Sequence, residues 1–360
     1  MEIFMQFLKA INRSKNLLLR KIKKTTLHSF LRVQRRYSKF EHKNIHKILL
    51  LRLDDKVGDM VVTTGTAFLL TQQGYRVSVL TGPVCAQMLN TCDYLDQVVL
   101  YKNRMSLDSL CAQNFDVIID FDDVQDYERL KLAWRMRRSH HVGFNKDLPG
   151  IYNLNINYID AENHITERHK RVLELFEVQG VEFNYQLGQC SNEQAKVKEA
   201  INFTHEDIIV SVNPFSGAKD KDFTEDQVCS LIFFIRSIDP KIKIVIIGQD
   251  DKVKHYNNFG AIIVPKSTIN TAIEIVRLSN LVVSTDTSIV HIANALSRPL
   301  ISVYNKRKLK DTGLPGYKIW APNYPLGKQV IVEETHIGKS QINQIFPMIE
   351  AELSASRTHQ

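Results

Sequence analysis

The sequence predicts an α/β protein with two domains. Short apolar runs typical of buried strands alternate with segments of helical spacing along most of the chain. A length of 360 residues exceeds what one hydrophobic core normally organises, and a hydrophobic content of 44% suffices for two cores. Residues 281–304 read as strand, polar turn, helix and strand, a βαβ unit in which ligands bind at the carboxyl ends of the strands.

The expected elements follow in chain order. The first domain is predicted to hold strands near Ile48–Leu53, Arg76–Thr81, Gln97–Tyr101 and Val117–Phe121. A helical segment is predicted near Glu167–Gln179. The second domain is predicted to hold strands at Ile208–Asn213, Lys243–Gly248, Ala261–Val264, Leu281–Ser284 and Leu300–Tyr304. A C-terminal helix is expected from about Lys339 to Glu352, kinked or shortened by Pro347.

The net charge of +8 is concentrated before the first strand. Residues 1–47 hold thirteen Lys or Arg against two Glu, a local balance of +11 that leaves the remainder near −3. Apolar residues recur among these basic residues at helical spacing: Ile3, Phe4, Phe7, Leu8, Ile11, Leu18, Leu19 and Ile22. A basic amphipathic helix suits an anionic membrane surface. Nucleic acid is the rival partner, but no reader motif accompanies the charge, and a solvated or self-packed extension is the third interpretation.

Cysteine and histidine spacing exclude several classes of site. The five cysteines are scattered without a CxxC pair, which favours reduced thiols over disulfides or a zinc site. The histidines form no HExxH pattern.

No apolar stretch approaches the length of a membrane span, and the N-terminus lacks a continuous signal-peptide core. We therefore expect a cytoplasmic protein.

The first candidate site follows the strand at Ile48–Leu53. Gly58 permits a tight turn of the backbone there. Asp59 falls where an aspartate either caps a helix or projects from its start into a cleft. An apolar helix is expected directly afterwards.

The second candidate site is the loop after the strand at Ile208–Asn213. It combines small residues, including Ser216 and Gly217, with lysines such as Lys221, ahead of a predicted helix. Free backbone N–H groups and a lysine together suit an anion. The loop is not a P-loop, because it lacks the GxxxxGK[ST] pattern. Gly248, after the next strand, is expected to let a nucleotide lie close to the backbone.

The third candidate site follows the strand at Leu281–Ser284. Asp286, Thr287 and Ser288 form a cluster of carboxylate and hydroxyl groups suited to capping a helix, and His291 lies on the first turns of that helix. Alone, this pattern would indicate an N-cap with an incidental surface histidine. Its combination with the two upstream sites favours a ligand site at the strand ends.

Together the three sites resemble the bacterial family-nine glycosyltransferases, the ADP-heptose:lipopolysaccharide heptosyltransferase family. The resemblance rests on Gly58-Asp59 after a strand, on Lys221-Asp222-Phe223, and on residues 286–291. Weaker similarities lie at residues 142–144 and 164–180, and the resemblance spans roughly residues 47–350. It implies two Rossmann-like domains facing across a cleft, the GT-B architecture, and inversion of the anomeric centre without a metal.

The sequence departs from the family pattern at four positions. Ser288 stands where a glycine usually follows the Asp-Thr pair, and Phe223 stands where tryptophan is common. Ser297 and Asn305 replace glycines at the end of the last motif. The donor pocket is therefore expected to differ from that of the standard core heptosyltransferases.

The charge pattern of the N-terminal residues and the resemblance of the remainder together predict how the chain is divided. Residues 1–46 would form the basic amphipathic extension, and residues 47–165 the acceptor-side domain. Residues 166–205 would form a helical linker. Residues 206–336 would bind the nucleotide sugar, and residues 337–360 would form a helix that packs back on the first domain.

The implied function is inverting transfer of a heptose from ADP-heptose to a lipopolysaccharide or lipooligosaccharide core, without a cofactor. Asp59 would be the general base. Lys221 and the N–H groups near Ser216 and Gly217 would stabilise the leaving diphosphate. The donor would be held by Gly248, Asp286, Thr287, Ser288 and His291. The acceptor would be a lipid-linked saccharide at the inner face of the inner membrane, where residues 1–40 would dock.

Three alternatives remain open at this point. The chain could use another nucleotide sugar for capsule or O-antigen synthesis, or it could be an inactive scaffold that binds a nucleotide sugar. Asp120 and Asp122 form a DxD pattern at a strand end, by which GT-A transferases hold a divalent metal. The other interpretation of that pattern is a strand-end turn with exposed carboxylates, and the separate Lys221 loop argues against GT-A.

Overall fold

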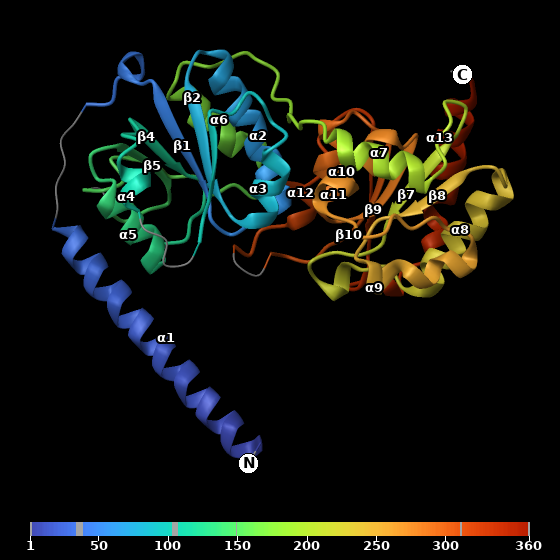
Figure 1. Ribbon diagram of the computed structural model, residues 1–360, viewed down its shortest axis with the longest axis horizontal. Coiled ribbons are helices and arrows are strands. Elements are labelled where there is room, and N and C mark those ends of the chain that lie inside the picture. The colour runs from blue at the N-terminus through green and yellow to red at the C-terminus, as the bar shows by residue number, and fades with distance from the viewer. Residues whose placement is uncertain (1, 34–38, 103–106, 149, 310–311, 359–360) are drawn as a thin grey trace.

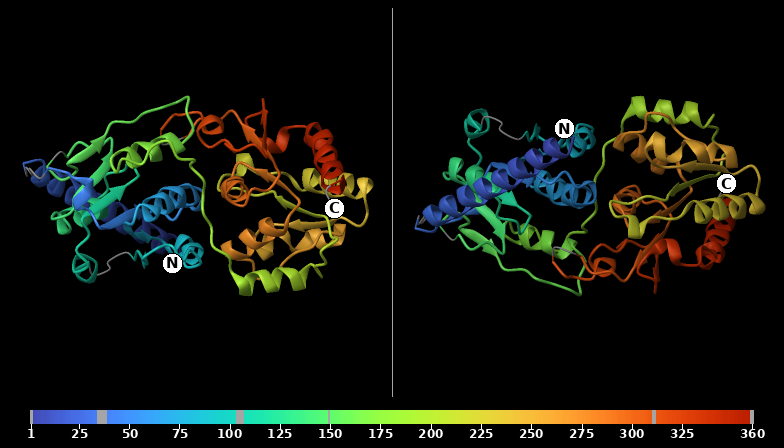
Figure 2. Two further views of the ribbon diagram at one scale, coloured as in Figure 1. Left: turned by 90° about the horizontal axis from the view of Figure 1, so that it is seen from above. Right: turned by 90° about the horizontal axis from the view of Figure 1, so that it is seen from below.

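A computed structural model describes residues 2–33, 39–102, 107–148, 150–309 and 312–358, without the side chains of residues 2–4, 6–11 and 357–358. Two α/β domains lie side by side along the long axis of the molecule, and a long N-terminal helix extends from the first (Figures 1 and 2). The predicted α/β class and the division into two sheets are confirmed.

The first sheet has six parallel strands in the order β3-β2-β1-β4-β5-β6. The strands are β1 (Lys47–Arg52), β2 (Arg76–Thr81), β3 (Gln97–Leu100), β4 (Val117–Asp120), β5 (His140–Phe144) and β6 (Leu154–Ile156). Helices α2 (Val57–Gln72), α3 (Pro83–Leu89), α4 (Asp108–Cys111), α5 (Tyr127–Arg135) and α6 (Thr166–Glu174) surround it. Ile48 and Leu50 belong to one core cluster with α2, whereas Leu49 and Leu51 belong to another with α4 and α5. The apolar run of β1 is therefore buried on both faces of the sheet.

The second sheet has five parallel strands in the order β11-β10-β9-β7-β8. The strands are β7 (Ile209–Asn213), β8 (Lys243–Ile246), β9 (Leu281–Thr285), β10 (Leu300–Asn305) and β11 (Gly327–Val332). Its helices are α7 (Ser191–Ala200), α8 (Glu225–Ile238), α9 (Asp250–Val253), α10 (Ile269–Leu278), α11 (Ser288–Ala295), α12 (Gly316–Ile319) and α13 (Phe346–Thr358). All parallel strands end at one edge of their sheet, so the three predicted sites lie at carboxyl edges.

The predicted strand at Ala261–Val264 is wrong. Ile262 makes a single isolated bridge to Val245, and the surrounding residues are not in a strand. The segment is confined between Gly260, which has a left-handed φ of 81°, and Pro265, which has no N–H to donate. The strands β5, β6 and β11 were not predicted, because their polar residues hide the apolar pattern.

The predicted helical linker at residues 166–205 is divided between the two domains. Helix α6 packs on α2 of the first domain, and α7 packs on α10 of the second. The chain between α6 and α7 forms no helix beyond the turn that ends α6. The domains are therefore joined by an extended segment rather than by an independent helical unit (Figure 2).

The expectation that the C-terminal helix returns to the first domain is wrong. Helix α13 packs against α8 at the outer end of the second domain, where Ile349 and Leu353 are fully buried (Figure 1). The apolar face of α13 thus completes the core of its own domain. Pro347 is the second residue of α13, a position whose N–H has no partner within the helix, so it causes no kink.

The N-terminal extension forms helix α1 (Glu2–Arg32), whose last turns pack on α5. Leu31 is fully buried there, and the ring of Phe30 meets the edge of Trp134 at a centroid distance of 5.1 Å. Residues 12–26 are exposed along their whole length, and the helix points away from the body (Figure 1). The predicted apolar positions Ile3, Phe4, Phe7, Leu8 and Ile11 lie outside the described side chains. Within the described part of the chain, no helix is both long and apolar enough to cross a membrane.

Candidate active site

Asp59 lies in the first turn of α2, after the carboxyl end of β1. The N-cap of α2 is Lys56, whose side chain makes no capping hydrogen bond. The sequence left open whether Asp59 caps the helix or projects from its start. The side chain projects from the helix, and its carboxylate accepts a hydrogen bond from Nη1 of Arg52 at 3.2 Å. One fifth of the Asp59 side chain remains exposed. The carboxylate is thus fixed from the side of the sheet and still accessible.

The pKa of Asp59 is raised above its ordinary value. Burial is the largest cause, and the negative charges of Asp54 and Asp122 add to it, whereas the positive charges of Arg52 and Lys56 oppose it. A carboxylate with a raised pKa accepts a proton more readily, which is what a general base requires.

The N-terminal end of α2 meets the N-terminal end of α11 across the domain interface. A Cβ built on Gly58 would lie 3.4 Å from Cδ2 of His291 and 3.7 Å from Cα of Ser288. The glycine therefore allows close approach of the two helices. This contact brings the first turn of α2, which carries Asp59, to the turn that carries Asp286, Thr287 and Ser288.

Lys221 and Asp286 form an ion pair beside this turn. Nζ of Lys221 lies 2.5 Å from a carboxylate oxygen of Asp286, and both side chains are mostly buried. Burial is the largest cause of a raised pKa at Asp286, and Lys221 opposes it. The two residues predicted to serve the donor are therefore brought together, although 65 positions separate them in sequence.

Thr287 caps α11, as predicted for this cluster. Its hydroxyl accepts a hydrogen bond from the amide of Ile289 at 3.2 Å and another from Nδ2 of Asn213 at 3.0 Å. Ser288 is the first residue of the helix and lies against Gly58. Thr287 thus shapes the turn, and Ser288 faces the first domain.

The loop after β7 uses part of its predicted anion-binding groups internally. The amide of Ser216 donates to the carboxylate of Asp222 at 2.6 Å, and the Ser216 hydroxyl donates to the carbonyl of Ala218 at 2.7 Å. Around Gly217, a Cβ would meet no atom within 4 Å, so open space adjoins its backbone. The Ser216 N–H is therefore already occupied by a carboxylate, while Gly217 stays accessible.

His291 is buried at the domain interface. Its ring centroid lies 5.5 Å from that of Trp320, 6.1 Å from that of Tyr185 and 6.3 Å from that of His164. Burial lowers the pKa of His291 to about 3, with a smaller contribution from His164, so the ring is neutral. Its Nδ1 has no hydrogen-bond partner among the described residues. The predicted hydrogen bond from His291 to the donor stays a prediction.

Gly248 has a packing reason to be glycine. A Cβ there would lie 2.5 Å from Cγ1 of Val253 and 3.3 Å from Cδ2 of Phe215. A side chain would therefore clash with Val253 of α9 and press on Phe215, which precedes Ser216 and Gly217 in the loop after β7. The predicted approach of a nucleotide to Gly248 remains a prediction.

The DxD carboxylates are held by basic side chains. Asp120 lies 2.9 Å from Nζ of Lys146 and 3.6 Å from Nε of Arg129. Asp122 accepts hydrogen bonds from Arg129 and from Arg52, the latter at 3.0 Å. Asp120 is 1% and Asp122 12% exposed, so the expectation of exposed strand-end carboxylates is wrong. Across the described residues, no group of three or more His, Cys, Asp or Glu side chains is arranged to hold a metal ion.

Sequence reasoning missed the basic residues of this network. Arg52 interrupts an apolar strand run, which was an available signal that a charge is buried there for a reason. Lys146 and Arg129 lie in polar stretches and offered no such signal. Trp320 and His164, which surround His291, were likewise not recognised, because contacts between distant segments leave no local pattern.

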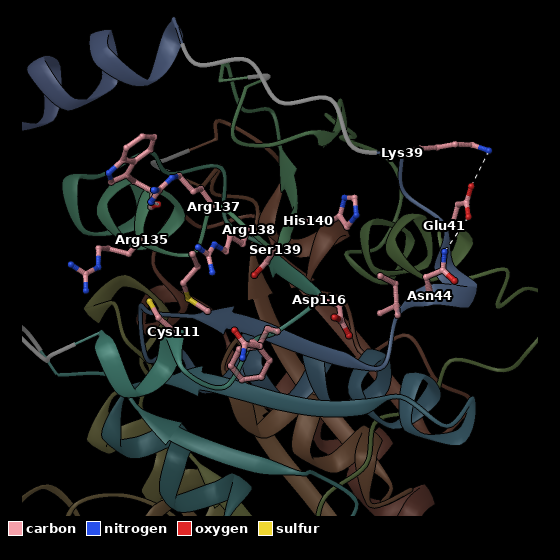
Figure 3. Close-up of a pocket in the computed structure, with 15 residues that line it drawn as sticks. Lys39, Glu41, Asn44, Cys111, Asp116, Arg135, Arg137, Arg138, Ser139 and His140 are labelled. Carbon is pink, nitrogen blue, oxygen red and sulfur yellow. Dashed lines mark hydrogen bonds and ion pairs between the residues drawn. The ribbon is translucent and has the colours of Figure 1, made fainter.

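A pocket of about 740 Å³ lies at the opposite edge of the first sheet. Asp116 precedes β4, His140 begins β5, Arg135 ends α5, and Arg137 and Arg138 follow in the turn before β5 (Figure 3). These residues lie at the amino ends of the strands. The pocket is therefore separate from the cluster at the carboxyl ends, where Asp59 lies.

Comparison with known proteins decides the family. The model of glycosyltransferase family 9 (heptosyltransferase) matches residues 105–341, more than half of the chain. The chain belongs to glycosyltransferase family 9. The matched range contains Lys221, Asp286 and His291, and it begins after Asp59.

Relatives of this family 9 glycosyltransferase are distant in sequence and similar in fold. The putative lipopolysaccharide heptosyltransferase 4 of Escherichia coli (strain K12) is 21% identical over 296 residues, covering 80% of this chain and 82% of that protein. E. coli ADP-heptose LPS heptosyltransferase II is 15% identical with a TM-score of 0.70, covering 86% of this chain and 99% of that one. E. coli heptosyltransferase WaaC, solved with ADP, is 18% identical with a TM-score of 0.61, covering 86% and 98%. The predicted GT-B fold is confirmed.

Proposed function

We propose that this protein transfers a heptose from ADP-heptose, with inversion, to the core of a lipopolysaccharide or lipooligosaccharide. Family membership and relatives whose names carry ADP-heptose, ADP and lipopolysaccharide support this donor and acceptor. The observation that carries the proposal is the meeting of α2 and α11, because it brings Gly58, the neighbour of Asp59, against Ser288 and His291, close in the chain to the Asp286 that pairs with Lys221.

In this mechanism Asp59 is the general base. An oxygen of the acceptor hydroxyl attacks the anomeric carbon while the bond from that carbon to the diphosphate oxygen breaks. Asp59 takes the hydroxyl proton, and ADP leaves with the bonding electron pair. The position of Asp59 at a carboxyl edge, its partial exposure and its raised pKa support this role.

Lys221 stabilises the negative charge that grows on the leaving diphosphate. Its Nζ lies in a mostly buried position, where a charge-assisted contact is stronger than in water. The accessible backbone at Gly217 and the neighbouring Ser216 belong to the same loop, and Gly248 packs beneath it. Asp286, Thr287 and Ser288, together with His291, complete the donor side, with Asp286 free to bind a sugar or ribose hydroxyl once the diphosphate engages Lys221.

The proposed transfer needs no metal. The two carboxylates of the DxD pattern, which would ligate a cation in a GT-A enzyme, are already neutralised by Lys146, Arg129 and Arg52. Lys221 supplies positive charge on the donor side instead. These contacts support a metal-independent mechanism.

Helix α1 docks the enzyme on anionic lipid at the cytoplasmic face of the inner membrane, where the lipid-linked acceptor lies. The exposed segment 12–26 has six basic residues and no acidic residue. It also exposes Leu17, Leu18, Leu19 and Ile22, so apolar and basic groups are both available to a lipid surface. The packing of Leu31 on α5 anchors this helix to the catalytic body.

A transfer assay tests the proposal. Purified protein is incubated with ADP-heptose and a panel of truncated lipooligosaccharides, and products are analysed by mass spectrometry and NMR. A gain of one heptose, with the anomeric configuration opposite to that of the donor, supports the proposal. Transfer from another nucleotide sugar would favour the capsule or O-antigen alternative. Binding of nucleotide sugars without transfer to any acceptor would favour the scaffold.

A further inference from the structure

Arg52, the last residue of β1, is held by three hydrogen bonds and a contact with an aromatic ring. Its Nε donates to the hydroxyl of Thr63 at 2.9 Å, and its Nη1 donates to Asp59 at 3.2 Å and to Asp122 at 3.0 Å. The guanidinium carbon lies 5.1 Å from the centroid of the Phe121 ring. Only 3% of the residue is exposed. One buried cation therefore joins the Asp59 carboxylate to a second carboxylate, that of Asp122, which follows the end of β4.

The second carboxylate is itself held in place. Asp122 also accepts a hydrogen bond from Arg129, which lies beside Asp120. Asp120 in turn contacts Nζ of Lys146 at 2.9 Å and accepts a hydrogen bond from the Tyr152 hydroxyl at 3.2 Å. Carboxylates and cations alternate through the network, so each charge has an opposite neighbour. This arrangement holds Asp122 in place, and Asp122 shares Nη1 of Arg52 with Asp59.

Besides Arg52, the charged and titratable groups around Asp59 come from four segments. The loop before α2 contributes Asp54 and Lys56, which pair with each other at 3.4 Å, and β4 leads to Asp122. From α6, His169 packs against α2 and is neutral, because burial lowers its pKa well below the ordinary value. From the second domain, α11 presents His291, which is also neutral. Arg52 is thus the cation in direct contact with Asp59 among the described residues.

We propose that Arg52 is a positioning residue, whose guanidinium orients the Asp59 carboxylate and favours its ionised form, while Asp122 shares the guanidinium and moderates this effect. The role of Asp59 as base rests on the proposed function. The electrostatic coupling between Arg52, Asp59 and Asp122 does not, because it follows from the contacts alone.

The coupling predicts shifts of opposite sign. Arg52→Gln removes the cation that stabilises the charged carboxylate, so the pKa of Asp59 rises further. Asp122→Asn removes a negative charge that raises the pKa of Asp59 and leaves the guanidinium to Asp59 alone, so the pKa of Asp59 falls. A residue that only supports the fold would not produce opposite shifts.

NMR titration of the full-length protein tests the proposal without an acceptor. Aspartate is labelled with ¹³C at the carboxyl carbon, and the Asp59 signal is assigned by its loss in Asp59→Asn. We expect Arg52→Gln to raise the pKa of Asp59 by about one unit or more, as for loss of an opposite charge in contact. Arg52→Lys keeps the charge without the fork and should restore the wild-type pKa in part.

Lys146→Met is the matched control. It removes another buried cation of the same network, one that does not contact Asp59, and should leave the pKa of Asp59 unchanged while lowering the melting temperature. If Arg52→Gln does not fold, the proposal is tested by Asp122→Asn alone, which should lower the pKa of Asp59. Unchanged pKa values in both variants, or shifts of the same sign, would overturn the proposal.

Activity separates this inference from the proposed function. If Asp59→Asn transfers heptose normally, Asp59 is not the base, whatever the titrations show. If Asp59→Asn is inactive and the Asp59 pKa does not respond to Arg52 or Asp122, the inference alone is wrong. With both correct, Arg52→Gln lowers kcat and leaves KM for ADP-heptose within a few-fold, because the donor side is untouched.

Discussion

Nζ of Lys221 lies 2.5 Å from the carboxylate of Asp286, although the two residues come from different loops of the second domain. The pair joins the lysine loop after β7 to the turn between β9 and α11. In the proposed reaction the incoming diphosphate competes with Asp286 for this lysine. Lys221 thereby passes from one anionic partner to another without being left unpaired.

Lys221→Ala should weaken ADP binding by roughly 10- to 100-fold, because a hydrogen bond to a charged group contributes about 1.5–3 kcal/mol. Adenosine, which has no phosphate, should bind both proteins equally. Calorimetry with the two ligands makes the comparison. Lys219→Ala, an exposed lysine in the same 3-10 helix (Lys219–Lys221), is the matched control. Equal losses for ADP and adenosine would remove Lys221 from the diphosphate site.

Turnover should survive removal of divalent cations. Protein dialysed against EDTA should transfer heptose at the untreated rate, because Lys221 supplies positive charge on the donor side and the DxD carboxylates are occupied by basic side chains. Initial rates before and after dialysis give the answer. Full loss of activity that Mg²⁺ or Mn²⁺ restores would promote Asp120 and Asp122 to metal ligands.

Deleting residues 1–22 should weaken binding to anionic vesicles and leave turnover on a soluble acceptor nearly unchanged. The deletion stops before Leu27 and Leu31, because these residues pack against α5 and their loss would expose the core beneath. Sedimentation with vesicles containing an anionic phospholipid measures binding, which should fall as salt rises.

A full-length variant with Arg20, Lys21, Lys23 and Lys24 changed to Gln is the control for charge. It should lose salt-dependent binding while keeping the helix. If the truncated and intact proteins bind anionic vesicles equally well at low salt, α1 does not dock the enzyme on lipid.

Activity should fall as the pH falls through the raised pKa of Asp59. The base must be ionised to take a proton, and burial disfavours the ionised form, so the acid limb of kcat/KM lies above the ordinary aspartate value of 3.8. Rates measured across the acid range locate the limb. A limb at or below the ordinary value would show that burial does not control this carboxylate.

Local pattern in the sequence was enough for most of the fold. Apolar runs located the central strands, and a cluster of carboxylate and hydroxyl side chains suited to capping located the turn before α11. Edge strands such as β6 and β11 were not predicted, because their residues are partly exposed and include polar side chains. The packing position of α13 was not predicted correctly, because the apolar face of a helix does not indicate which domain core it joins.

The position of the candidate site residues at strand ends was predictable from the sequence, whereas most of their contacts were not. Asp59, Lys221 and Asp286 follow strands, so their gathering at the carboxyl edges follows from parallel-sheet geometry. The occupation of the Ser216 amide by Asp222 and the burial of His291 depend on loop conformation and on the domain interface. Neither feature produces a periodic pattern in the sequence. The pairing of Arg52 with Asp59 and Asp122 likewise needs three segments placed in space.

Heptosyl transfer by Asp59→Asn, measured beside its affinity for ADP, tests the central claim most directly. Asn preserves the size of the side chain and cannot accept the proton, so transfer should fall by about 10² or more, as for loss of a general base. The affinity for ADP should remain that of the wild type, because the donor side is intact. Asp54→Asn, which changes a neighbouring carboxylate paired with Lys56, should keep most of the activity. Transfer by Asp59→Asn within a few-fold of the wild-type rate would contradict the account.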